Sequence, residues 1–206
     1  MDINGKAIKI ILLGETGVGK TNLINVFIGS KFALNTLSTM TCYSYEGKYK
    51  YKNEFYNYTI WDTAGQEKYR SLNKIFVRDA QIIILVYSII DRASFNELNF
   101  WLQYAKENKG DDDYILGLVG NKSDLFLNET VTEEEGMKFA SDKKIKFVIT
   151  SALEKCDNYI KFVNGLIKDY IKIFIKNKNE KNENPNDLSI SINNESTLAE
   201  KKKCCK

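Results

Sequence analysis

The segment spanning residues 14–21 constrains the fold of this chain more than any other part of the sequence. Its sequence, GETGVGKT, matches the pattern G-x-x-x-x-G-K-[ST]. An apolar run over residues 7–13 precedes it and has the length and branching of a buried parallel strand. Apolar side chains then recur at helical spacing over residues 20–28, before Gly29. In such a strand–turn–helix unit, the backbone N–H groups of the turn and the positive end of the helix dipole point into one concavity. This concavity suits phosphate oxygens.

We therefore predict that this loop binds a nucleoside triphosphate. Lys20 is expected to reach the outer phosphates, and the Thr21 hydroxyl is expected to hold Mg²⁺. A chance glycine-rich turn is the alternative, and it would rarely be flanked by both a strand pattern and a helix pattern. The predicted contact residues are Gly14, Glu15, Thr16, Gly17, Val18, Gly19, Lys20, Thr21 and Asn22.

Composition excludes several classes of protein. With 43% apolar residues, the 206-residue chain can bury a substantial core. Its net charge of +3 is too small to indicate nucleic-acid binding, and without histidine it has no histidine metal site or general base. The four cysteines lack the spacing of zinc ligands, which favours a reducing compartment. We expect no signal peptide, no myristoyl group and no membrane-spanning segment.

Predicted strands and helices alternate along the chain, which indicates an α/β fold. We expect a mostly parallel six-stranded sheet with one antiparallel strand, at residues 43–51, and with helices on both faces. Right-handed crossovers would bring the loops after the parallel strands to one edge of this sheet, where ligands bind. The predicted strands cover residues 7–13, 43–51, 55–61, 82–87, 114–119 and 145–149.

Local signals define three helices after the first. Asp91 is a candidate N-cap for a helix that runs through Lys106. Thr132 and Glu135 form a capping box for the next helix, which carries Met137, Phe139 and Ala140. The last helix covers residues 158–175. The predicted inward-facing residues of the first and last of these helices are Phe95, Leu98, Trp101, Leu102, Ala105, Ile160, Val163, Leu166, Ile167, Tyr170, Ile171 and Phe174.

The composition changes from about residue 176, where Asn, Lys, Glu and Ser dominate. Such a segment buries too little apolar surface to order itself, so residues 176–203 are predicted to be a flexible tether. A short strand at residues 188–192 is the alternative. The chain is thus divided into a nucleotide-binding domain at 1–175 and a tail at 176–206.

A second motif, Asp62-Thr63-Ala64-Gly65, follows the predicted strand at residues 55–61. The Asp62 carboxylate is expected to organise Mg²⁺ through its water shell, and the Gly65 N–H to bond the γ-phosphate. Gln66 is a candidate for orienting an attacking water molecule. An isolated D-x-x-G sequence would favour a plain turn, but its place after the phosphate-binding loop favours a functional role.

Two further segments favour guanine as the base. Asp124, in residues 120–124 (GNKSD), offers two acceptor oxygens to the guanine N1–H and 2-amino groups, whereas adenine presents an acceptor there. Asn121 is expected to tie neighbouring loops together, and the stem of Lys122 to cover the base. After the last strand come Ser151, Ala152 and Leu153, and the Ala152 N–H is predicted to bond the guanine 6-oxo group.

With these motifs in this order, residues 6–176 resemble a Ras-superfamily small GTPase with a P-loop G domain, and within it the Rab family of membrane-trafficking GTPases. The segments that favour Rab are Gly14-Glu15-Thr16-Gly17, Ile60-Trp61-Asp62-Thr63-Ala64-Gly65-Gln66-Glu67, Lys68-Tyr69-Arg70-Ser71-Leu72, Leu85-Val86-Tyr87, Asp91-Arg92-Ala93-Ser94-Phe95, Trp101-Leu102 and Cys204-Cys205.

The resemblance implies further roles. Phe32 would stack on the guanine, and Thr39 would ligate Mg²⁺ and sense the γ-phosphate. Gln66 would position the hydrolytic water, with Lys20 as the other catalytic residue. Effectors would bind through aromatic residues such as Trp61.

The sequence departs from the Rab pattern in switch I, the loop that carries Thr39. Rabs continue this threonine with Ile-Gly-x-x-Phe, whereas here Met40-Thr41-Cys42-Tyr43-Ser44 follows. Thr36 and Thr41 are rival positions for the same role. Ser88 also stands where a Rab often has aspartate.

The resemblance implies a slow GTPase that binds GTP and GDP as a monomeric trafficking switch. Expected partners are effectors, an exchange factor, a GTPase-activating protein and a prenylation escort or dissociation inhibitor. Because of the atypical switch I, a non-hydrolysing membrane scaffold is the alternative. A P-loop kinase is a third, but the sequence lacks an arginine-rich lid, since its only arginines are Arg70, Arg78 and Arg92.

The end of the chain is predicted to be a lipid anchor. Three lysines precede Cys204 and Cys205, and both cysteines are predicted to be geranylgeranylated. Two lipid chains anchor a protein stably, and each lysine adds roughly 1 kcal/mol near an anionic leaflet. A solvated charge run with two incidental thiols is the alternative. The expected location is the cytoplasmic face of an intracellular membrane, in exchange with the cytosol.

Overall fold

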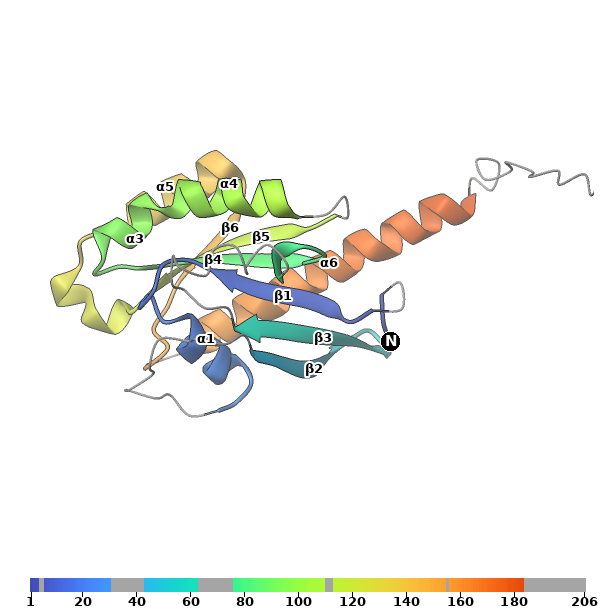
Figure 1. Cartoon of the computed structure of the whole chain (residues 1–206). Coiled ribbons are helices and arrows are strands. Elements are labelled where there is room, and N and C mark those ends of the chain that lie inside the picture. The colour runs from blue at the N-terminus through green and yellow to red at the C-terminus, as the bar shows by residue number, and fades with distance from the viewer. Residues whose placement is uncertain (4–5, 31–42, 63–75, 110–112, 155, 184–206) are drawn as a thin grey trace, which may run out of the picture.

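A computed structural model describes residues 1–3, 6–30, 43–62, 76–109, 113–154 and 156–183 (Figure 1). Its six-stranded sheet has the order β2-β3-β1-β4-β5-β6, in which β2 and β3 are antiparallel and the other neighbours are parallel. This confirms the predicted fold class and the single antiparallel strand. The strands are β1 (Ile8–Leu13), β2 (Tyr43–Tyr51), β3 (Glu54–Asp62), β4 (Ile82–Ser88), β5 (Ile115–Asn121) and β6 (Lys146–Ile149).

Helices cover both faces of the sheet (Figure 1). Helices α1 and α6 pack on one face, and α4 and α5 pack on the other. The central strands are therefore apolar on both sides: every residue of β4 is buried, and its side chains alternate between the two faces. The helices are α1 (Lys20–Phe27), α3 (Arg92–Asn96), α4 (Leu98–Asn108), the short 3₁₀ helix η2 (Ser123–Asn128), α5 (Glu133–Lys143) and α6 (Asp157–Glu183).

The predicted helix starts are confirmed by their caps. The Asp91 carboxylate accepts hydrogen bonds from the N–H groups of Ala93 and Ser94. The capping box of Thr132 and Glu135 is present with both of its hydrogen bonds. The helix predicted to run from Asp91 through Lys106 is instead divided at Glu97 into α3 and α4.

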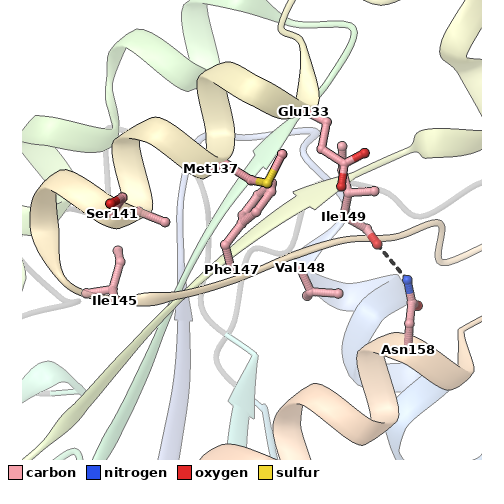
Figure 2. A pocket seen from close by; sticks show the side chains of 9 residues that line it. Glu133, Met137, Ser141, Ile145, Phe147, Val148, Ile149 and Asn158 are labelled. Atoms are coloured by element: carbon pink, nitrogen blue, oxygen red, sulfur yellow. Dashed lines mark hydrogen bonds between the residues drawn. The ribbon is translucent and has the colours of Figure 1, made fainter.

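The α5 helix lies beside the edge strand β6, where an open groove separates it from the start of α6 (Figure 2). Met137 borders this groove and is 48% exposed, whereas Ala140, one turn further along, is buried. The predicted inward face of α6 is confirmed, since Val163 and Ile167 are fully buried.

Helix α6 is longer than predicted, because it continues to Glu183 rather than ending at residue 175. Lysine and glutamate are good helix formers, so the polar composition that suggested a tether is compatible with a helix that extends past the core. The only proline of the sequence, Pro185, follows two residues later, and a residue before proline is disfavoured in a helix. Within the described residues, no helix is both long enough and apolar enough to cross a membrane.

Candidate functional site

The loop between β1 and α1 is held tightly against the sheet. Gly14 has φ of 151°, and a Cβ there would lie 2.1 Å from the carbonyl oxygen of Val86 in β4. Lys20, at the start of α1, is only 6% exposed, and its ammonium donates to the carbonyl oxygens of Gly14 and Glu15, at 2.8 Å each. The loop thus folds around the lysine that was predicted to reach the phosphates.

Burial changes the ionisation of this lysine. Desolvation lowers the pKa of Lys20 to about 8, and the negative charges of Asp62 and Glu15 partly oppose this shift. A buried cation with incomplete charge compensation favours the approach of an anion. The site therefore has the electrostatic character expected for phosphate binding.

Asp62 ends β3 and is 2% exposed, and its charge acts on Lys20, to which Thr21 is adjacent. A hydroxyl and a carboxylate are hard oxygen donors, which suit Mg²⁺ completed by phosphate and water. Among the residues that the structure describes, no cluster of three or more His, Cys, Asp or Glu side chains forms a metal cage.

Asn121 connects the three loops that follow β1, β5 and β6. Its side chain is 1% exposed, and its amide nitrogen donates to the Val18 carbonyl oxygen at 2.8 Å. Its amide oxygen accepts from the Ala152 N–H at 3.2 Å. The structure thus confirms the prediction that Asn121 ties neighbouring loops together.

Asp124 and Ser151 lie side by side at the same edge of the sheet. The Ser151 hydroxyl donates to Asp124 Oδ1 at 2.5 Å and accepts from the N–H groups of Leu153 and Glu154, at 3.0 Å each. This arrangement fixes the orientation of the carboxylate predicted to recognise guanine. Because the Ala152 N–H already bonds Asn121, its bond to the guanine oxygen stays a prediction.

The contacts of two side chains, Asn158 and Trp101, were not predicted from the sequence. The Asn158 amide donates to the carbonyl oxygen of Ile149 at 2.6 Å (Figure 2) and accepts from the Thr150 hydroxyl at 2.8 Å, which holds the loop before α6. Trp101, predicted only as a core residue, donates its indole N–H to Glu15 in the phosphate loop. Helical periodicity predicts which side chains of α4 are buried, but it does not predict which group accepts the hydrogen bond of a buried indole N–H.

Six of the predicted site residues lie outside the described residues. They are Phe32, Thr39, Gly65, Gln66, Cys204 and Cys205.

Comparison with known proteins agrees with this geometry. A family model described as "Ras family" matches residues 9–180. The Ras-related protein Rab-11B of Dictyostelium discoideum is 38% identical over 186 residues, which cover 90% of this chain and 80% of the relative. The chain belongs to the Rab family. The Ras-related protein RABA1b of Arabidopsis thaliana is 34% identical over 96% of this chain and 93% of its own length. The GTP-binding protein ypt3 of Schizosaccharomyces pombe is 35% identical over 71% of this chain and 68% of its own length.

Membership of the Rab family also identifies the activity of the chain. The chain is a small GTPase, a guanine-nucleotide switch of the type that acts in membrane trafficking.

Proposed function

We propose that this Rab-family chain binds GTP and GDP together with Mg²⁺ between the loops that follow β1, β5 and β6. The observation that carries this proposal is the buried Asn121 side chain, which bonds Val18 on one side and Ala152 on the other. One side chain thereby fixes the phosphate loop relative to both base-recognition loops. A nucleotide that bridges these loops would find its phosphate and base contacts already aligned.

The phosphates would be bound by the loop around Lys20. Its ammonium, the backbone N–H groups of the loop and the start of α1 all favour negative charge. Thr21 and Asp62, with Thr39 from switch I, would hold Mg²⁺. When bound, this ion neutralises phosphate charge.

The base would be recognised by Asp124. Ser151 donates a hydrogen bond to one of its oxygens, which restricts the orientation of the carboxylate. A carboxylate accepts from both N–H donors of guanine, and it would repel the acceptor nitrogen that adenine presents. The backbone of Lys122 is left-handed, with φ of 68°. The aliphatic stem of its side chain would cover one face of the guanine ring.

Hydrolysis would depend on Gln66, which we assign to the attacking water, and on Lys20. The rate is expected to be slow without a partner. Arg92, one of three arginines in the sequence, bonds Glu135 and the Thr130 carbonyl oxygen, away from the phosphate loop. An activating protein that supplies an arginine would accelerate the reaction by about 10³–10⁵-fold.

At the cellular level, we propose that lipids on Cys204 and Cys205 attach the chain to the cytoplasmic face of an intracellular membrane. An exchange factor would load GTP, and effectors would bind the GTP form. A prenylation escort or dissociation inhibitor would carry the lipidated monomer through the cytosol.

The test of base recognition is Asp124→Asn. This change replaces one acceptor oxygen by an N–H donor, so the side chain opposes the guanine 2-amino group and matches the 2-oxo group of xanthine. We expect the affinity for GTP, measured with a fluorescent analogue, to fall by about 100-fold, and the affinity for XTP to rise above it. Asp142→Asn, at an exposed position of α5, is the matched control. Unchanged GTP binding by the Asp124 variant would contradict the proposal.

A further inference from the structure

The phosphate loop is joined to the core by a contact between residues that are 86 positions apart. Trp101, in α4, donates its indole N–H to Glu15 Oε1 at 2.9 Å. Glu15 is the second residue of the loop and is half-buried. The contact therefore joins a polar side chain of the predicted nucleotide site to a helix on the other side of β4.

The indole ring has little freedom to move. Trp101 is 1% exposed, and the rings of Phe100 and Tyr104 pack against it edge to face, with centroids at 5.3 and 5.8 Å. The same apolar cluster includes Leu13, the last residue of β1. Because the ring is fixed by packing, its N–H is a fixed donor, and a Glu15 side chain bonded to it is fixed as well.

The rest of the loop is anchored elsewhere. At one end, Gly14 lies against the backbone of β4, and at the other end Asn121 bonds the Val18 carbonyl. Between these anchors lie Glu15 and the exposed residues Thr16 and Gly17. Within this span, Glu15 is held through both its backbone, by Lys20, and its side chain, by the indole.

We propose that Trp101 is a positioning residue for nucleotide binding, which acts by holding Glu15 and thereby the phosphate loop in its binding conformation. This inference rests on the proposed function, because it takes the loop to be the phosphate site. Trp101 itself does not contact the nucleotide. Its loss lets the span after Gly14 sample other conformations, and the bound nucleotide then dissociates faster.

The experiment uses the full chain loaded with fluorescent GDP and Mg²⁺, and it measures the dissociation rate after excess unlabelled GDP is added. Trp101→Phe keeps an aromatic ring but loses the N–H donor, and Glu15→Ala loses the acceptor. Each is expected to speed dissociation by about tenfold, the value of one hydrogen bond to a charged group. Because both remove the same bond, the double variant is expected to dissociate no faster than either single variant.

Two further variants separate positioning from packing. Glu15→Gln keeps an acceptor oxygen for the indole N–H, so it is expected to dissociate more slowly than Glu15→Ala. Phe100→Leu alters the same aromatic cluster without touching Glu15, and it is expected to leave the dissociation rate near that of the unchanged chain even where thermal stability falls.

Several results would overturn the inference. The first is a GDP dissociation rate that is unchanged in Glu15→Ala. The second is a double variant whose rate increase is the product of the increases in the two single variants. The third is a Phe100→Leu chain that releases GDP as fast as Trp101→Phe. Glu15→Ala alone decides the matter where Trp101→Phe does not fold. An unaltered chain that binds no GDP contradicts the proposed function itself, whereas normal GDP binding with an insensitive Glu15 contradicts only the role of Trp101.

Discussion

Replacing Asn121 by alanine should destabilise the chain more than any comparable change at a surface asparagine. The side chain is 1% exposed and makes one hydrogen bond to the Val18 carbonyl oxygen and one to the Ala152 N–H. Its removal leaves two backbone groups without these partners, and each buried unsatisfied group costs about 1–3 kcal/mol. We therefore expect the free energy of unfolding to fall by about 3 kcal/mol.

Urea denaturation followed by circular dichroism, at a fixed excess of GDP and Mg²⁺, measures this loss. With a slope of about 2 kcal/mol per molar urea, the midpoint should fall by about 1.5 M. Asn128→Ala, at an exposed position of η2, is the matched control and should change the midpoint little. Asn121→Asp keeps the volume but removes the donor to Val18, so it should also destabilise. A midpoint for Asn121→Ala equal to that of the control would show that the two hydrogen bonds of Asn121 do not stabilise the fold.

Three other predictions follow from contacts in and near the site. Gly14→Ala should lower the free energy of unfolding by about 3 kcal/mol or more, because its Cβ would lie 2.1 Å from the Val86 carbonyl oxygen in β4. A Cβ at Gly29 meets nothing within 4 Å, so Gly29→Ala is the comparison. Equal losses of unfolding free energy in urea denaturation would contradict this prediction. Because the pKa of Lys20 is lowered to about 8 and phosphate favours the charged form, GTP affinity measured by fluorescence titration should fall progressively as the pH rises from 7 through 8 to 9.5. Constant affinity over this range would be inconsistent with the prediction. Arg92 lowers the pKa of Glu135 to about 2, so the stabilisation from this pair is present above about pH 4.5 and is lost as the pH falls toward 2. In urea denaturation, Arg92→Ala should therefore lower the free energy of unfolding at pH 7 and lower it much less at pH 2.5. An equal loss at both pH values would contradict this prediction.

Local and periodic signals in the sequence predicted most of the fold. The continuous apolar run at residues 82–87 predicted a strand buried on both faces, and β4 is one. The capping box at Thr132 fixed the start of α5 because both of its hydrogen bonds are made within one turn. The end of α6 was missed because a helix that projects past the core has no apolar periodicity to mark it.

The parts of the candidate site that lie in short sequence motifs could be predicted. The contacts that depend on tertiary packing could not. Asn121 ends β5 and Asp124 lies three residues later, so their place at the edge of the sheet could be inferred from the strand pattern. The loop-joining role predicted for Asn121 is confirmed, whereas recognition of guanine by Asp124 stays a prediction. The bond from Trp101 to Glu15 joins a helix and a loop that sequence spacing does not relate. The pairing of Ala152 with Asn121 likewise depends on how closely two strand ends approach, which no local pattern reports.

The most direct test of the central claim is to identify the nucleotide that co-purifies with the full chain and to follow phosphate release from GTP with and without Mg²⁺. We expect bound GDP or GTP and slow, Mg²⁺-dependent release of phosphate, which Gln66→Leu abolishes. Bound ATP would contradict the role assigned to Asp124. Bound GTP with no measurable phosphate release would contradict the switch and favour a non-hydrolysing scaffold.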